Sequence, residues 1–385
     1  MQEKVGFPTW GFGLIAGSFF AASLVAQLAL ARHADRGRAR TLLVVAIGLA
    51  LISLTWMAFA GSLLEITLAR GIGGLATGCW GPAARATAIA HRPDQTARRL
   101  GYLATGDTSG LVIGPLVGAV LAANFGLEVA FGVFAAAVLG LIPVLFTSPL
   151  NEVSQDRAVL NGTPAKPLGP LALLKKRPVA QATVLAMALF LPIGFYETVW
   201  AKHVSNLGGS TTIIALSVAL YGLPYMLVAP LGGRLGDRVG HARVALIGAA
   251  ALAVVTFITG LPRNIWILLP IGVVEAMISA VAYPNALAAV SNACKREEQA
   301  TGQGLAGAAS IGAAGVMALL AGPLFDFGGP SLGFTATAAL VAAGAFVAYR
   351  LDPVVFSRQP DASSAQHYRS SENVNVTDSP PAASA

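Results

Sequence analysis

The chain has 385 residues, of which 55% are hydrophobic and only 11% are charged. With a mean hydropathy of +0.68, this composition excludes a water-soluble globular protein, whose surface needs more charge. The 43 glycines and 22 prolines suit membrane helices, because neighbouring segments satisfy the backbone groups that these residues leave open. The composition therefore predicts an all-α membrane protein.

The formal net charge is +7, but the basic residues stand in short clusters between apolar runs. This arrangement favours topology signals over a nucleic-acid surface, so no nucleic-acid partner is expected. Cys79 and Cys294 are the only cysteines and have neither CxxC nor His-rich spacing. We expect no disulfide, no metal site and no cofactor. The first apolar run, from Val5 to Ala31, is too long for a signal-peptide core and predicts a retained helix.

Apolar runs of about 20 residues predict eleven membrane spans. They lie at 10–31, 41–60, 63–88, 100–122, 128–147, 179–201, 211–232, 244–261, 264–291, 300–323 and 331–350. They divide the chain into an N-terminal bundle of five spans (1–147), a cytoplasmic linker (148–178), a C-terminal bundle of six spans (179–350) and a disordered cytoplasmic tail (351–385).

Lys and Arg gather in alternate loops, which places those loops in the cytoplasm. The basic loops contain Arg32, Arg36, Arg38 and Arg40; Arg92, Arg98 and Arg99; Arg157, Lys166, Lys175, Lys176 and Arg177; Arg234, Arg238 and Arg243; Lys295 and Arg296; and Arg350 and Arg358. The opposite loops hold little beyond Lys4, Lys202 and Arg263. With an odd number of spans, this predicts a multi-pass protein of the cell membrane with its N-terminus outside and its C-terminus in the cytoplasm.

The segment "GGRLGDRVGHAR" (232–243) concentrates charge between two apolar runs, and "ARHADRGRAR" (31–40) repeats it with one residue missing. Gly233 and Gly240 permit a tight turn, while Arg238 and Arg243 hold the loop in the cytoplasm. Alternatively, the aspartates of the two copies, Asp35 (followed by Arg36) and Asp237, form ion pairs or meet a helix N-terminus across the two halves. Repetition of helical halves is typical of secondary transporters.

These motifs resemble those of the major facilitator superfamily over nearly the whole chain up to Arg350. The pattern G-x-L-x-D-R-x-G-x-x-R between helices of each half is matched by Gly233, Leu235, Asp237, Arg238, Gly240 and Arg243. "LARGIGGLATG" (68–78) resembles the fourth-helix pattern through Arg70 and Gly74. "GLVIGPLVGA" (110–119) resembles the fifth-helix pattern of antiporters through Gly110, Gly114, Pro115 and Gly118.

The resemblance implies two pseudo-symmetric helical bundles and export of a small molecule in exchange for protons by alternating access. Its motifs align the first predicted span with the family's second helix, which gives eleven spans in place of twelve. A monomer is expected. The same fold would also suit a membrane sensor or an inactive relic that no longer transports.

Four ionisable residues within spans are the candidates for the proton and substrate cavity. An Arg near the bilayer centre costs at least ~2.5 kcal/mol, so Arg70 is expected to face a cavity or a partner rather than snorkel outward. Asp107 would carry a proton or pair with Arg85. Glu275 lies near the middle of its span, and Glu197 lies near the outer end of another. Instead of lining the cavity, either residue could make a hydrogen bond between helices.

Gly110, Gly114 and Gly118 are spaced by four, so they share a helix face that would let another helix approach closely. Pro115 and Pro82 would bend their helices. Trp80, Tyr196 and Tyr283 could stack on a ligand, but packing is the favoured interpretation.

No P-loop or HExxH motif occurs, and all five histidines fall in predicted loops, interfaces or the tail. ATP hydrolysis and an intramembrane enzyme are therefore not expected. The small-residue spans with a few acids suit a hydrophobic or cationic compound, and suit sugars or other metabolites only slightly less well.

Overall fold

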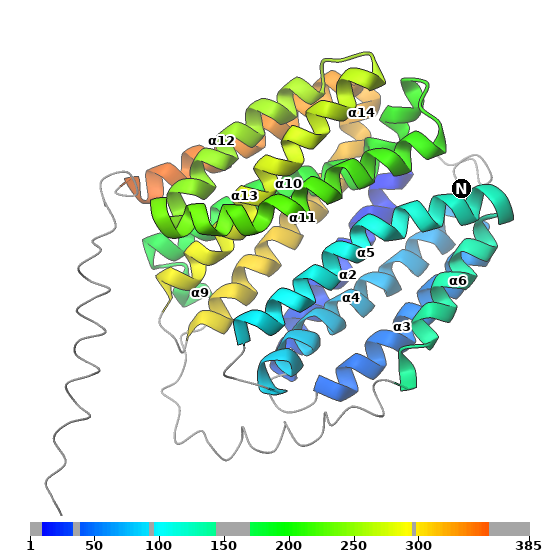
Figure 1. Ribbon diagram of the computed structural model, residues 1–385, viewed down its shortest axis with the longest axis horizontal. Helices are drawn as coiled ribbons and strands as arrows, with labels where there is room; N and C mark the ends of the chain where they lie inside the picture. Colours follow the sequence, from blue (N-terminus) through cyan, green and yellow to red (C-terminus); the bar gives the residue numbers. More distant parts are fainter. Residues whose placement is uncertain (1–9, 34–38, 92–95, 144–169, 295–297, 354–385) are drawn as a thin grey trace, which may run out of the picture.

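The computed structural model describes residues 10–33, 39–91, 96–143, 170–294 and 298–353. Helices form two groups in Figure 1. The first contains α2 (Trp10–His33), α3 (Ala39–Phe59), α4 (Leu63–His91), α5 (Thr96–Phe125) and α6 (Leu127–Leu139). The second contains α9 (Pro170–Leu173), α10 (Arg177–Asn206), α11 (Thr211–Val239), α12 (His241–Thr259), α13 (Ile265–Ala293) and α14 (Gln299–Leu351).

Each predicted span contains a helix of the structure. α14 covers the last two. The two parts meet at a kink at Gly329, whose φ of 68° is not helical. By length and hydropathy, seven of the described helices could cross a membrane. α6 ends at Leu139, before the end of the predicted fifth span, and residues 144–147 lie outside the described part of the chain.

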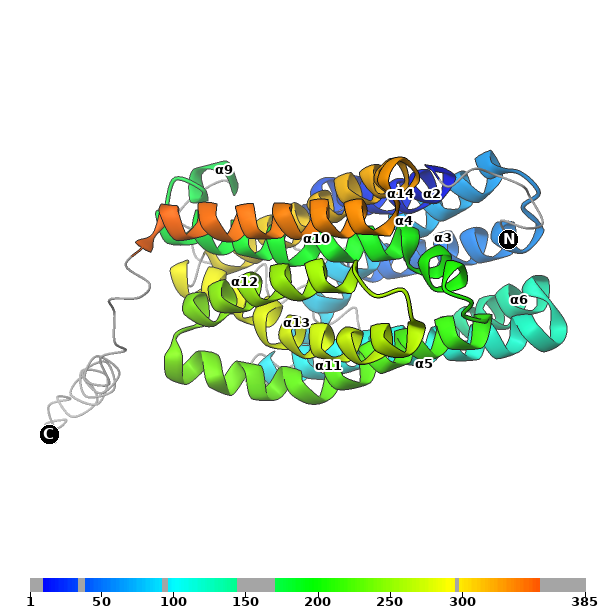
Figure 2. The ribbon, with the colours of Figure 1, turned by 90° about the horizontal axis from the view of Figure 1, so that it is seen from above.

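Within each group, long helices pack side by side: α2 and α3 on α4, α10 on α14, and both α11 and α12 on α13. The two groups meet where α2 packs along α14 and α5 along α11 (Figure 2). The first of these contacts is close, since a Cβ on Gly13 would lie 2.7 Å from the carbonyl oxygen of Ala318. Small residues therefore bring the two groups into backbone contact.

A glycine also sets the distance between α10 and α14. A Cβ on Gly194 would overlap the backbone of Ala314, whereas one on Gly272 of α13 would meet no described atom within 4 Å. We expect Gly194→Ala to lower the free energy of unfolding by about 1–3 kcal/mol through overpacking. Gly272→Ala should instead raise it by about 0.5–1 kcal/mol, because Ala is the better helix former. Thermal unfolding in one detergent compares the two, and equal shifts would contradict the close packing at Gly194.

The charged segment 232–243 differs from the expected tight turn. Gly233 lies within α11, and only Gly240 turns the chain, with a φ of 101°. Helical backbone continues to Val239 because the charged side chains of Arg234 and Arg238 are exposed and need no loop to reach water.

A polar contact with α13 holds this segment in place. The side-chain amide of Asn285 donates to the carbonyl of Gly232 (2.9 Å), and its Oδ1 lies 2.6 Å from Nδ1 of His241. Asp237 pairs with Nε2 of His241 at 3.3 Å, so its partner belongs to the same helical group. Among the described residues, the ion-pair partner of Asp237 thus lies in its own group, and a contact of Asp237 across the two halves stays a prediction. Asp35 and Arg36 lie outside the described residues.

Gly236 is the glycine of this segment that packing requires. A Cβ there would overlap Asn285 and His241, whereas a Cβ on Gly233 would meet no described atom within 4 Å. Gly236→Ala should lower the free energy of unfolding by about 1–3 kcal/mol. Gly233→Ala is the matched control and should stabilise by about 0.5–1 kcal/mol. The melting temperatures of both variants test this, and a Gly236→Ala protein as stable as Gly233→Ala would rule out the contact.

The structure corrects the expected helix contact on α5. A Cβ on Gly110 or Gly114 would meet no described atom within 4 Å, and one on Gly118 would touch only the ring of Phe134, at 3.4 Å. The close helix approach predicted for this face is therefore wrong at Gly110 and Gly114. Pro115 lies inside α5.

The end of the predicted linker is also structured. Residues 170–173 form α9, whose Leu173 is fully buried in the core of the second group. α10 follows at Arg177, inside the predicted linker range. Lys176 forms a 2.5 Å ion pair with Glu298 at the start of α14. Apolar and ionic contacts thus anchor the beginning of the second group.

Candidate functional site

An ion pair connects the two helical groups. Arg70 of α4 donates to the carboxylate of Glu197 on α10, and both side chains are partly exposed, at 35% and 42%. The Arg70 guanidinium also lies 4.4 Å from the centre of the Phe19 ring on α2. Two of the four predicted cavity residues, one from each group, are therefore brought together.

The second polar feature is a buried carboxylate in the second group. Glu275 of α13 is 2% exposed and accepts hydrogen bonds from three hydroxyl groups. The Tyr196 hydroxyl lies 2.7 and 2.6 Å from its two oxygens, Thr256 donates at 3.0 Å and Thr259 at 3.3 Å. Hydrogen bonds of this kind offset the cost of burying a carboxyl group. The structure thus contains a preformed polar site inside an apolar bundle.

Tyr196 connects the two features, because it precedes Glu197 on α10 and bonds Glu275. Its ring packs edge-on against Trp200 at 5.4 Å and contacts Phe334 at 5.8 Å. The sequence pointed to Glu275, Glu197 and Tyr196 but missed the two threonines of α12. Their spacing of three residues places both hydroxyls on one helix face, which is too common a pattern to have identified them.

Asp107 is separate from the hydrogen bonds of Glu275 described above. It is exposed on α5, about three turns from the start of that helix. The alternative pairing with Arg85 stays open, since the Arg85 side chain lies outside the described residues.

His203, which was expected in a loop or interface, lies at the end of a helix and is buried. It lies in the last turn of α10, is 2% exposed and makes no hydrogen bond to a described residue through either ring nitrogen. Its ring packs against Trp200, Phe325 and Phe334 at 5.3–6.3 Å.

The aromatic residues singled out from the sequence mainly pack. Tyr283 contacts Phe190 at 5.1 Å, and Trp80 packs against the core of the first group. Cys79 and Cys294 are free and buried. The described residues contain no cluster of three His, Cys, Asp or Glu side chains suited to a metal ion.

Long apolar helices that enclose a charged pair and a buried carboxylate define a multi-pass membrane protein with an internal polar site. The model of the Major Facilitator Superfamily matches residues 1–202 and, again, 182–377. The chain belongs to this superfamily, as its motifs predicted.

Curated relatives include "Multidrug resistance protein MdtG" of Citrobacter koseri, 31% identical over 255 residues that cover 64% of this chain and 61% of the relative. "Uncharacterized MFS-type transporter YuxJ" of Bacillus subtilis is 29% identical over 260 residues, covering 66% and 65%. The matched region spans about three fifths of the length of MdtG.

Solved structures share the fold over most of the chain. A mutant of the nucleoside transporter NupG has a TM-score of 0.74 at 15% identity and covers 91% of this chain and 93% of its own. A D-xylose-proton symporter has the same TM-score at 16% identity, with coverage of 91% and 89%. At these identities the likeness concerns the fold.

Proposed function

We propose that the protein is a secondary active transporter that exports a small molecule in exchange for protons by alternating access. The Arg70–Glu197 pair is the observation that carries this proposal, because it joins the two helical groups beside a buried, protonatable carboxylate. Transporters of this architecture bind their cargo between two helical units that rock against each other. MdtG, whose name describes multidrug resistance, supports the direction of transport.

The two groups act as pseudo-symmetric bundles, residues 1–147 and 179–350, with eleven spans in total. The protein lies in the inner (cell) membrane. Its N-terminus is outside, and its C-terminal tail, 351–385, is in the cytoplasm. On this topology, Arg70 and Glu197 both lie toward the outer side, since α4 starts and α10 ends there. Their contact closes the outer side in the state described by the structure.

Glu275 is the proposed proton carrier. It is a carboxyl group buried within a span, and its three hydroxyl partners can donate to the ionised carboxylate or accept from the protonated one. Tyr196 transmits the change in protonation of Glu275. Its hydroxyl forms or breaks the hydrogen bond to the Glu275 carboxylate, and the next residue, Glu197, forms the ion pair with Arg70 of the other bundle. Protonation and the contact between bundles are thereby coupled.

Asp107 and the glycine face of α5 have proposed roles on the opposite side. The open space at Gly110 and Gly114 lets a cargo or a moving helix approach α5, which also carries Asp107. The proposed cargo is a hydrophobic or cationic compound, and the active unit is a monomer.

Ethidium export tests the proposal. In inside-out vesicles energised to be acidic inside, the wild-type protein should accumulate ethidium, and collapse of the pH gradient should release it. A variant with both Asp107→Asn and Glu275→Gln should match vesicles without the protein. Ethidium accumulation that does not depend on the pH gradient would exclude proton exchange. If the wild-type protein shows no gradient-driven flux of ethidium, the non-transporting sensor is favoured.

Cysteine labelling tests the topology. Single cysteines replace Gln2, Ser154 or Ala385 in a background without Cys79 and Cys294, and intact cells receive a membrane-impermeant maleimide. We expect only the cysteine at position 2 to react. Protection of all three positions would mean an even number of spans.

A further inference from the structure

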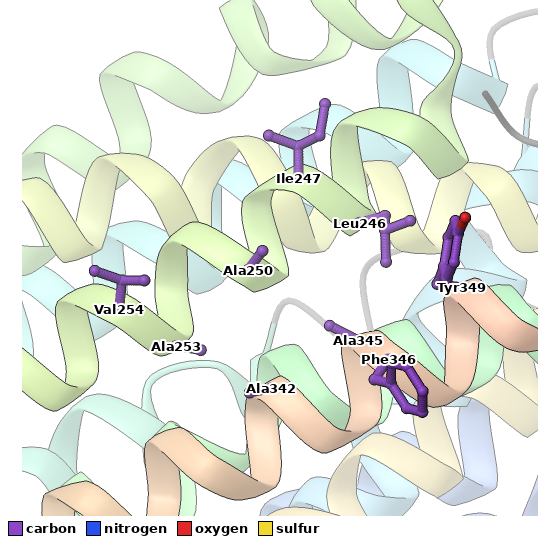
Figure 3. Close-up of a pocket in the computed structure, with 9 residues that line it drawn as sticks. All are labelled: Leu246, Ile247, Ala250, Ala253, Val254, Ala342, Ala345, Phe346 and Tyr349. Atoms are coloured by element: carbon purple, nitrogen blue, oxygen red, sulfur yellow. The ribbon is translucent and has the colours of Figure 1, made fainter. Parts of the chain in front are cut away.

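An apolar groove runs along the membrane-facing side of the second helical group, between α12 and the last part of α14 (Figure 3). Its volume is about 400 Å³. Alanines form the floor, with Ala253 and Ala345 each 7% exposed. Larger side chains form the walls, and Ile247, Val254 and Phe346 are each more than half exposed. Short residues between long ones thus leave a narrow apolar channel open to the bilayer.

The groove has the length of an acyl chain within one leaflet. Its lining on α12 extends from Leu246 to Val254, which corresponds to about 12 Å along the helix. One leaflet contributes about half of the ~30 Å hydrocarbon core. The lining on α14, residues 342–349, lies within ten residues of the end of that helix at Leu351, which is on the proposed cytoplasmic side, so the groove extends from the middle of α12 into the cytoplasmic leaflet.

Positive charge is concentrated at one end of the groove. Leu246 and Tyr349 lie at the same end in Figure 3. Arg243 precedes Leu246 by about one helical turn, and Arg350 directly follows Tyr349. The Arg350 guanidinium lies 6.0 Å from the centre of the Phe346 ring, which is a wall of the groove. Within five positions of either arginine in the sequence, Asp352 is the one acidic residue.

We propose that this groove binds one acyl chain of an anionic phospholipid, whose headgroup lies beside Arg350 and Arg243. The apolar channel fits the chain, and the two arginines fit the headgroup of a lipid with net negative charge. A second copy of the protein fits less well, since stable dimers bury about 800 Å² per partner and this groove is only as wide as one row of alanines. The proposal rests on the proposed topology but not on transport.

Native mass spectrometry of the purified full-length protein tests the proposal. The probes are phosphatidylglycerol and phosphatidylcholine with identical palmitoyl and oleoyl chains. We expect one phosphatidylglycerol to bind about fivefold more tightly than phosphatidylcholine, the preference expected from about one basic residue near the headgroup. Arg350→Gln should weaken this preference, and the double variant with Arg350→Gln and Arg243→Gln should remove it, while phosphatidylcholine binding stays unchanged. Equal affinity of the wild type for both lipids would overturn the proposal.

Matched alanines separate the groove from the rest of the lipid-facing surface. Ala342 lines the groove, while the neighbouring Ala343 is exposed but outside the lining. Ala342→Leu should weaken phosphatidylglycerol binding severalfold, and Ala343→Leu should not. Equal effects of the two changes would mean that lipid binds nonspecifically.

Two further results would assign the groove to other occupants and overturn the proposal. A dimer in the mass spectrum that Ala342→Leu disrupts would identify a second copy. Stronger phosphatidylglycerol binding after Phe356→Ser, a change in the apolar start of the C-terminal tail, would identify the tail.

Discussion

Glu275→Gln should abolish proton-driven accumulation of ethidium in inside-out vesicles, reducing it to the level of vesicles without the protein. The reason is chemical: Gln keeps the size of the side chain and its carbonyl acceptor for Tyr196 and Thr256, but it binds no proton in the working pH range. Accumulation against the ethidium gradient is lost, because the transporter no longer carries a proton when it changes back to the state that binds ethidium.

The fold and the cargo site should survive this change. Exchange of ethidium across the membrane in the absence of a pH gradient should therefore continue in Glu275→Gln, and Glu275→Asp, which keeps a carboxyl group, should retain part of the uphill transport. If Glu275→Gln accumulates ethidium as well as the wild type, Glu275 is only a structural hydrogen-bond acceptor.

Reversal of one charge of the Arg70–Glu197 pair is the second large effect. Arg70→Glu places two carboxylates together where the structure has an ion pair, so the outer ends of the bundles should separate. A partly exposed pair contributes only about 0.2–1 kcal/mol, so neutralisation by Arg70→Gln should raise the open fraction by about 1.4-fold to fivefold. Repulsion in Arg70→Glu should raise it further.

A buried cysteine reports this opening. Ala318 is fully buried where α14 meets α2, so the labelling rate of Ala318→Cys by a maleimide follows the open fraction. The double variant with Arg70→Glu and Glu197→Arg should restore the slow rate of the original pair. Failure of the reversed pair to restore it, with both single variants fast, would show that the two side chains act independently.

Much of the fold followed from the sequence because membrane spans are long and their loops carry charge. The predicted spans 63–88 and 264–291 agree with α4 and α13 to within three residues at each end. The boundaries failed at 232–239, where charged residues continue a helix past the apolar run, since helical backbone tolerates Arg and Asp as soon as their side chains reach water.

The site was only partly predictable for a related reason. An ionisable residue in an apolar run signals a polar contact between helices, which pointed to Arg70, Glu197 and Glu275. The partners of those groups are ordinary residues such as Thr256 and Thr259, whose hydroxyls matter only because α12 packs on α13. Likewise, the spacing of Gly110 and Gly114 defines a helix face but does not tell what lies opposite it.

The most direct test of alternating access follows both sides of the protein at once. Spin labels at Leu64 and Trp266 report the outer ends of the bundles, and labels at Thr41 and Arg238 report the inner ends; all four side chains are exposed. Pulsed electron resonance measures both distances across a range of pH, with and without ethidium. The account predicts that the outer distance lengthens as the inner one shortens, and that Glu275→Gln removes the pH response. Distances that change together, or that do not change at all, would contradict it.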